Sequence, residues 1–197
     1  LVQLIASRGY GVLQMNYRGS RGYGSAFAMA GVRQVGRAIQ DDIEDATRWA
    51  IESGVADPKR VAVAGASYGG YSALFALGKS PALYRCGISF AGVTDWLAIF
   101  RHGEAREEYR FARKAWRDRI GDPNEDEDFL KSISPVNFAV DIAAPVLILQ
   151  GKEDRTVPQR QAKVMVSALR KAGREVESEF LSGEGQSLAN EKTRLIA

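Results

Sequence analysis

Residues Arg60–Tyr71 read RVAVAGASYGGY, and this stretch decides the fold. An apolar strand leads directly into a G-x-S-x-G motif centred on Ser67, and an apolar helical segment follows the motif. In that context the motif is typical of a nucleophile elbow, a sharp turn from strand to helix that forces its central residue into a strained backbone conformation. Small residues two positions before and after the serine allow neighbouring chain to pass close by. The pattern therefore predicts a serine hydroxyl at a helix N-terminus, where free N–H groups favour a developing negative charge.

Apolar strands alternate with helical segments over most of the chain. We expect five strands, at residues 11–16, 60–65, 86–91, 145–150 and 176–181. Helices are expected at 39–53 and 158–172, and a last one is expected to begin near Leu188. This alternation predicts βαβ units and a mostly parallel sheet, in which functional groups gather at the carboxyl ends of the strands. Residues 101–130 are crowded with charge instead, and we expect a polar helical insertion there, over one face of the sheet.

A serine elbow calls for an acid and a base later in the chain, in that order. Asp154 follows the strand at 145–150, where a carboxylate can orient an imidazole. The alternative is a loop aspartate that caps the next helix, although Thr156 is also suited to that task. The base is expected after the strand at 176–181, but the chain reads GEGQS at 183–187 and holds no histidine there. The only histidine of the chain is His102, in the charged segment.

Four passages together resemble the catalytic domain of the prolyl oligopeptidase family of serine peptidases, in its acylaminoacyl-peptidase and dipeptidyl-peptidase-like branch. They are NYRGSRGYG at 16–24, GASYGGY at 65–71, PVLILQGKEDRTVP at 145–158 and GEGQSLANE at 183–191. The resemblance implies one α/β-hydrolase domain over residues 1–197 that cleaves peptide or acyl bonds through an acyl-enzyme on Ser67. It places Gln186 at the position of the catalytic histidine. It also implies that the family's N-terminal β-propeller is absent and that the chain is shorter than the family's catalytic domain at both ends.

The resemblance assigns roles to individual residues. Ser67 would attack the acyl carbon, and Asp154 would be the acid of the triad. The backbone N–H of Tyr68 would be one oxyanion donor. The Tyr23 hydroxyl matches a second donor of some family members, and its alternative is a packing tyrosine in a glycine-rich turn. The remaining matches line the family's apolar specificity pocket, and their alternative is ordinary core: Val93, Trp96 and Val157.

A glutamine at the base position changes the expected chemistry. The amide of Gln186 has no basic lone pair near neutral pH and cannot accept the serine proton. Loss of one triad member typically lowers the rate by about 10⁴- to 10⁶-fold. Three interpretations stay open. Gln186 replaces a histidine in an otherwise active enzyme, or it marks a natural non-catalytic homologue that binds peptides or acyl groups, or His102 serves as the base instead of being a solvated surface histidine.

The composition of the chain limits the classes of partner that we expect. Hydrophobic residues make up 45%, charged residues 26%, and the net charge is +3, with acidic and basic residues interspersed. These values predict solvated faces rather than a nucleic-acid patch. No stretch is long enough to cross a membrane and no signal peptide is visible, so we expect no membrane partner and a cytoplasmic protein. Cys86 is predicted to be a buried, inert thiol. No cofactor or metal is implied, and the expected partners are a small peptide or acyl substrate and, through an exposed sheet edge, a second copy of the chain.

Overall fold

A parallel sheet of four strands forms the centre of the computed structural model, which describes residues 2–187. The strands follow one another in space as they do along the chain: β1 (Ala62–Ala66), β2 (Cys86–Phe90), β3 (Val146–Gly151) and β4 (Val176–Leu181). Each neighbouring pair is parallel, with Ala64 opposite Ile88 and Ile148 opposite Ser178. The inner strand β3 is almost wholly buried, whereas the edge strand β1 alternates between exposed and half-buried residues. The predicted parallel α/β architecture is therefore confirmed.

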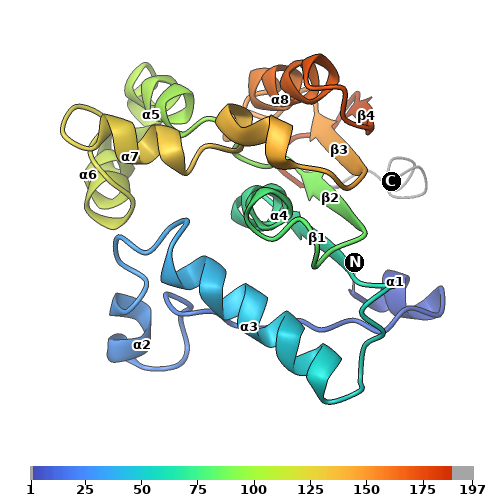
Figure 1. Ribbon diagram of the computed structural model, residues 1–197. Coiled ribbons are helices and arrows are strands. Elements are labelled where there is room, and N and C mark those ends of the chain that lie inside the picture. Colours follow the sequence, from blue (N-terminus) through green and yellow to red (C-terminus); the bar gives the residue numbers. More distant parts are fainter. Residues whose placement is uncertain (1, 188–197) are drawn as a thin grey trace.

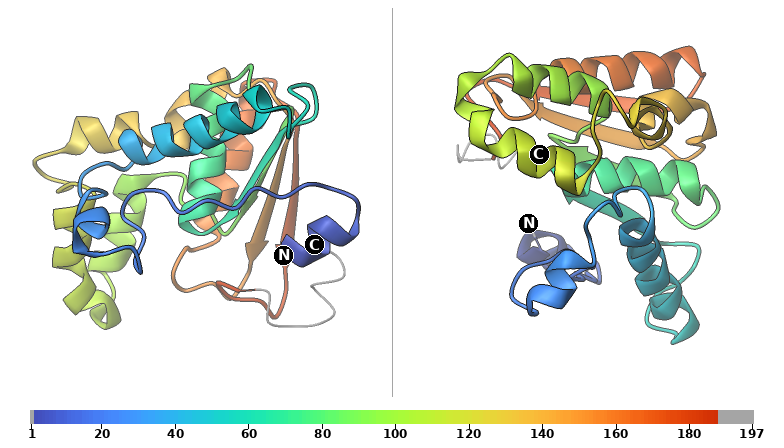
Figure 2. Two further views of the ribbon diagram at one scale, coloured as in Figure 1. Left: turned by 90° about the horizontal axis from the view of Figure 1, so that it is seen from below. Right: turned by 90° about the vertical axis from the view of Figure 1, so that its left-hand side faces the viewer.

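Helices connect the strands and cover the sheet (Figures 1 and 2). Helix α4 follows β1 and packs against β1 and β2, while α8 packs against β3 and β4. The 3₁₀ segment η2 (Pro135–Asp141) contacts both helices and joins them into one layer. The α-helices are α1 (Val2–Ser7), α2 (Ser25–Met29), α3 (Ala38–Glu52), α4 (Tyr68–Lys79), α5 (Trp96–Glu104), α6 (Arg110–Arg119), α7 (Glu127–Ser132) and α8 (Arg160–Lys171).

Two apolar clusters hold these layers together. The first lies between the sheet, α4 and α8, and includes the fully buried Leu77, Met165 and Leu169. The second joins α4 to the segment predicted as a polar insertion, through residues such as Tyr71 and Leu130. Helices α5, α6 and α7 and the 3₁₀ turn η1 (Glu107–Tyr109) fall within or overlap this segment. The charged segment is therefore anchored to the helix that follows the elbow by an apolar face of its own.

The prediction of a strand at residues 11–16 was wrong. This segment has no ladder partner within the described part of the chain, and Val12 and Leu13 are 38% and 51% exposed. An apolar run becomes a strand only where a neighbour supplies hydrogen bonds for its backbone. In the described sheet β1 pairs with β2 alone, and residues 11–16 do not pair with its open edge.

Other boundaries differ by only one or two residues from those expected. Helix α3 corresponds to the helix predicted at 39–53. Helix α8 begins two residues after Pro158 and ends before Gly173. The φ of 69° at Gly173 is typical of a residue that follows a helix. The helix expected near Leu188 lies outside the described residues. Cys86 is half-buried rather than fully buried. None of the described helices is both long and apolar enough to span a lipid bilayer.

An ion pair ties the glycine-rich turn after residue 16 to α3. The backbone N–H and Nε of Arg18 donate to Asp42 Oδ2 over 2.9 and 2.8 Å, and a terminal nitrogen of Arg18 donates to Oδ1 over 2.5 Å. These hydrogen bonds hold the pKa of the Asp42 carboxyl below its ordinary value. We expect Asp42→Asn to lower the free energy of unfolding by about 1–2 kcal/mol at pH 7, because the amide carries no charge and its NH2 group cannot accept from Arg18.

The loss of stability in Asp42→Asn should be smaller at low pH than at neutral pH. The pKa of Asp42 is lower in the folded than in the unfolded chain, so its contribution is present above the unfolded pKa and disappears as pH falls through the folded pKa. Urea unfolding at pH 7 gives the full contribution, and unfolding at pH 3, below the ordinary pKa of an aspartate, shows its decline. Asp45→Asn, at an exposed position of the same helix, is the matched control and should change stability by less than about 0.5 kcal/mol. A cost for Asp42→Asn that stays undiminished at pH 3 would contradict this account.

Candidate active site

Ser67 is the single residue between β1 and α4, and its backbone is strained. Its φ of 55° and ψ of −117° lie in a region that L-residues rarely adopt. The turn is fixed on both sides, because the Ser67 N–H donates to the carbonyl of Phe90 over 2.8 Å and its carbonyl accepts from the N–H of Tyr71 over 3.0 Å. The strand–turn–helix geometry predicted for the G-x-S-x-G motif is therefore present, with Ser67 at the N-cap of α4.

Glycine is required at one of the two expected positions, Gly65, and also at Gly70. A Cβ on Gly65 would lie 2.3 Å from the carbonyl carbon of Gly69, and a Cβ on Gly70 would lie 2.9 Å from the carbonyl oxygen of Phe90. A Cβ on Gly69 would meet no atom within 4 Å. The backbone of Gly69 therefore makes the close contact with Gly65, but a side chain at position 69 would meet no neighbouring atom.

Gln186 bridges Ser67 and Asp154. Its amide nitrogen lies 2.8 Å from Oδ1 and 2.5 Å from Oδ2 of Asp154, and its amide oxygen accepts from the Ser67 hydroxyl over 2.8 Å. This orientation of the amide is assigned from the hydrogen bonds, because in the opposite one the oxygen would face only acceptors and the nitrogen only donors. The structure thus brings together three residues that lie far apart in the sequence, and their roles as nucleophile, base position and acid stay predictions.

Asp154 is 6% exposed, and its carboxylate is held by its own loop. The backbone N–H groups of Thr156 and Val157 each donate to Oδ1 over 2.9 Å, and Gln150 Nε2 approaches Oδ2 at 3.3 Å. Burial raises the pKa of the Asp154 carboxyl, and these hydrogen bonds oppose the rise because they favour the charged form. These hydrogen bonds therefore fix the orientation of the Asp154 carboxylate, which faces Gln186.

Sequence reasoning did not identify Gln150 as part of this arrangement. Its side chain is fully buried at the end of β3, and Nε2 also donates to the carbonyl of Val157 over 3.0 Å. A glutamine at the end of the otherwise apolar strand PVLILQ was the available signal, because a buried amide requires polar partners. Gln150 connects the strand to the loop that carries Asp154.

The two oxyanion candidates differ in their surroundings. Tyr68 is the first residue of α4, where backbone N–H groups have no partner within the helix, so its N–H is available beside Ser67. The Tyr23 hydroxyl accepts a 2.6 Å hydrogen bond from Asn16 Nδ2, and the residue is 58% exposed. Tyr23 is thus engaged within its own turn in this structure, and an oxyanion role for either residue stays a prediction.

The three residues predicted to line an apolar pocket are buried. Val93, Trp96 and Val157 are 7%, 5% and 3% exposed, and all belong to the second apolar cluster. The loop that bears Val93 and Trp96 is fixed by Gln161 of α8, which bonds the backbone N–H groups of Thr94 and Asp95. In this structure these side chains serve as core, and their contact with a substrate stays a prediction.

His102 does not complete the arrangement around Ser67. Its Nε2 lies 2.9 Å from the carbonyl oxygen of Arg155, the residue after Asp154. Because a carbonyl only accepts, Nε2 carries a proton, and the Ser67 hydroxyl already donates to Gln186. The observed contact connects His102 to the acid loop, and a role as base stays a prediction.

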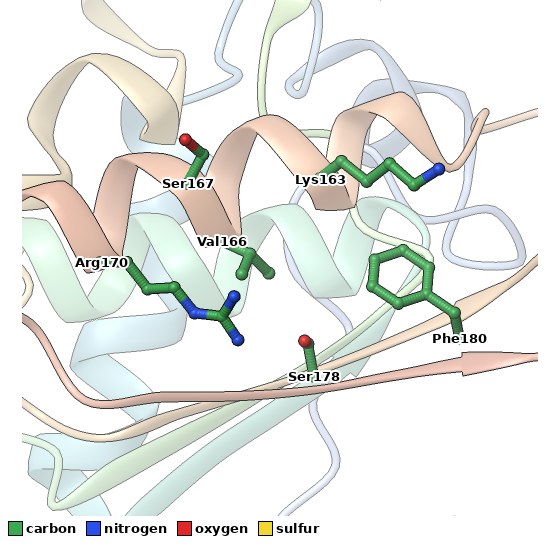
Figure 3. A pocket seen from close by; sticks show the side chains of 6 residues that line it. All are labelled: Lys163, Val166, Ser167, Arg170, Ser178 and Phe180. Atoms are coloured by element: carbon green, nitrogen blue, oxygen red, sulfur yellow. The ribbon is translucent and has the colours of Figure 1, made fainter.

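A hollow of about 310 Å³ lies elsewhere, between α8 and β4 (Figure 3). It includes none of the predicted site residues. Within the described residues, no group of three or more His, Cys, Asp or Glu side chains is placed to hold a metal ion. The hollow is lined by Lys163, Val166, Ser167, Arg170, Ser178 and Phe180.

The chain is similar to known peptidases in both sequence and structure. A profile of the prolyl oligopeptidase family (peptidase S9) matches residues 1–196. Dipeptidyl peptidase family member 6 of Caenorhabditis elegans is 37% identical over 171 residues, which cover 85% of this chain and 23% of that protein. A crystal structure of puromycin hydrolase aligns with a TM-score of 0.89 at 30% identity, over 98% of this chain and 28% of that one. The acylaminoacyl peptidase of Pyrococcus horikoshii aligns with a TM-score of 0.83 at 29% identity, over 94% of this chain and 29% of that one. The chain therefore spans about a quarter of the length of these proteins.

Proposed function

The chain belongs to the prolyl oligopeptidase family, and from this premise we propose that Ser67 is the nucleophile of a peptide- or acyl-bond hydrolase whose base position holds Gln186. The observation that carries the proposal is the unbroken hydrogen-bond chain from Ser67 through Gln186 to Asp154. The strained φ of Ser67 supports it, because such strain persists where the surrounding structure enforces it and is typical of nucleophile elbows. The proposed substrates are small peptides or acylated amino compounds, in line with the names of the relatives.

In the proposed reaction Ser67 Oγ bonds to the acyl carbon, and the carbonyl oxygen becomes an oxyanion beside the N–H of Tyr68. The serine proton must leave as the bond forms, and the departing amine must gain a proton. A histidine at position 186 would perform both transfers, whereas the Gln186 amide oxygen can accept a hydrogen bond but not the proton itself. We therefore expect the chain as written to be strongly impaired, with the elbow and oxyanion donors providing the residual rate.

A second function is favoured by the completeness of the same hydrogen-bond chain. Both polar atoms of the Gln186 amide have partners, and neither Ser67 nor Asp154 is left unpaired on this side of the site. A satisfied network of this kind is stable without a titrating group at position 186. The alternative proposal is thus a non-catalytic hydrolase fold that binds peptides or acyl groups without turnover.

A fluorophosphonate probe tests the state of Ser67, because it reacts with activated serines. We expect slow labelling of the chain as written, with the label on Ser67 and no label after Ser67→Ala. Gln186→His should be labelled about 10³-fold faster, since it regains a base. Rapid labelling of the chain as written would contradict an impaired site and would direct attention to His102 as the base. Peptide binding that survives Ser67→Ala, together with no labelling in any variant, would favour the binding module.

A further inference from the structure

One peptide unit lies between the charged insertion and the proposed acid. Its carbonyl, that of Arg155, accepts from His102 Nε2 over 2.9 Å and from the Tyr109 hydroxyl over 3.2 Å. Its N–H, that of Thr156, donates to Asp154 Oδ1 over 2.9 Å. The carbonyl and the N–H belong to the same planar, conjugated amide. Groups that bind the carbonyl therefore act directly on the N–H that holds the carboxylate.

This arrangement has a definite physical consequence. Donors at an amide oxygen pull electron density from the nitrogen and make its N–H a stronger donor, as in other chains of cooperative hydrogen bonds. They also fix the plane of the amide, and with it the direction of the N–H. We propose that His102 and Tyr109 are positioning residues that orient Asp154 through the Arg155–Thr156 peptide unit.

The insertion is built to hold these two donors in place. Helices α5 and α6 approach closely at Gly103, where a Cβ would lie 2.9 Å from the Trp116 ring. The ring of Trp116 contacts that of Tyr109 in a tilted arrangement, with centroids 5.4 Å apart and an interplanar angle of 39°. Gly103 is adjacent to His102 in α5, so Trp116 packs beside both donors, against the backbone next to His102 and against the ring of Tyr109. Residues of the insertion thereby contact the loop that follows β3 and carries Asp154.

Hydrogen exchange at single amides tests the inference. The inference rests on the proposed function, which gives Asp154 its importance, but the exchange measurement does not depend on activity. In the full chain, His102→Phe should speed exchange of the Thr156 amide about fivefold, because a hydrogen bond that supports it is lost. Tyr109→Phe, which removes only a hydroxyl, should act in the same direction by about twofold. His102→Gln restores an N–H donor and should bring exchange back to the original rate.

The control is Lys114→Ala, which removes an exposed ion pair with Asp118 on α6 and should leave the Thr156 amide unchanged. Exchange in β3 should be equal in all variants, which shows that the fold is intact. Unchanged exchange at Thr156 in both His102→Phe and Tyr109→Phe overturns the inference. Failure of His102→Gln to restore the rate also overturns it, because packing rather than hydrogen bonding would then explain the effect.

Activity separates this inference from the proposed function. In a Gln186→His background, His102→Phe should lower kcat about tenfold and leave KM within about twofold, since the loss concerns orientation of the triad and not substrate binding. If Gln186→His gains no activity, the proposed function fails while the exchange result still decides the role of the peptide unit. If Gln186→His is active and His102→Phe changes neither kcat nor exchange, the positioning role alone is wrong.

Discussion

Gln186→His is expected to raise kcat/KM for aminoacyl-arylamide hydrolysis by about 10³-fold or more over the chain as written. The elbow, the proposed nucleophile and the proposed acid already lie together, and the proposal lacks only a group that accepts the proton of Ser67. Removal of one member of a serine triad typically lowers the rate by about 10⁴- to 10⁶-fold, so restoration of that member recovers much of this factor.

The geometry favours a direct replacement. In the amide of Gln186 one carbon separates the nitrogen that faces Asp154 from the oxygen that faces Ser67. In an imidazole one carbon likewise separates Nδ1 from Nε2. A histidine at position 186 can therefore present Nδ1–H to the carboxylate and Nε2 to the serine hydroxyl with little movement of the neighbouring side chains. This Nδ1–H would take the place of the Gln186 amide donor and would likewise favour the charged form of the Asp154 carboxylate, whose pKa burial raises.

Three variants test whether the gain has the proposed origin. Gln186→Leu lacks both a base and hydrogen bonds, and should gain nothing. In the Gln186→His background, Ser67→Ala should abolish turnover by an acyl-enzyme, and Asp154→Asn should remove most of the gain because the imidazole would lose its orienting acceptor. Initial rates with purified protein, measured after thermal unfolding has shown an intact fold, decide the outcome. A folded Gln186→His protein with an unchanged rate would refute the proposal that the base alone is missing.

The local features of this site were readable from sequence because each depends on a short stretch of chain. The elbow follows from an apolar strand, a serine between small residues and an apolar helix, and the structure has Ser67 at φ 55°. Asp154 follows from its place after a buried strand, because parallel strands bring their carboxyl ends to one edge of the sheet. The position of Gln186 came from the resemblance to a family, since nothing in a glutamine by itself indicates a triad.

Features that depend on contacts between distant segments were not predictable in the same way. Residues 11–16 have the composition of a strand but no partner, and pairing is decided by the neighbouring chain and not by the segment itself. The peptide unit after Arg155 is invisible in a sequence, because its backbone atoms make the contacts and the side chain does not. Val93 and Trp96 follow a strand end as expected, yet their packing against α4 and the insertion determines whether they face solvent.

Gly65→Ala is expected to lower the free energy of unfolding by about 3 kcal/mol, which corresponds to a fall in Tm of roughly 6–12 °C for a domain of this size. The added Cβ would lie 2.3 Å from the carbonyl carbon and 2.4 Å from the carbonyl oxygen of Gly69. Both are backbone atoms in the first turn of α4, so the strain cannot be relieved by rotation of a side chain. The helix must shift away from β1, and Ser67 lies at the joint between them.

Gly69→Ala is the matched control, because it adds the same methyl group two residues after Ser67. No atom lies within 4 Å of that Cβ, and alanine is favoured over glycine in a helix, so stability should be unchanged or slightly higher. In a Gln186→His background, Gly65→Ala should also lower kcat by about 10²-fold, because displacement of a nucleophile by about 1 Å has effects of that size. Equal unfolding midpoints for the two alanine variants would show that the turn at Ser67 has room to relax. A lower kcat for Gly69→Ala than for Gly65→Ala would show that the close contact of Gly65 with Gly69 is not what positions the serine.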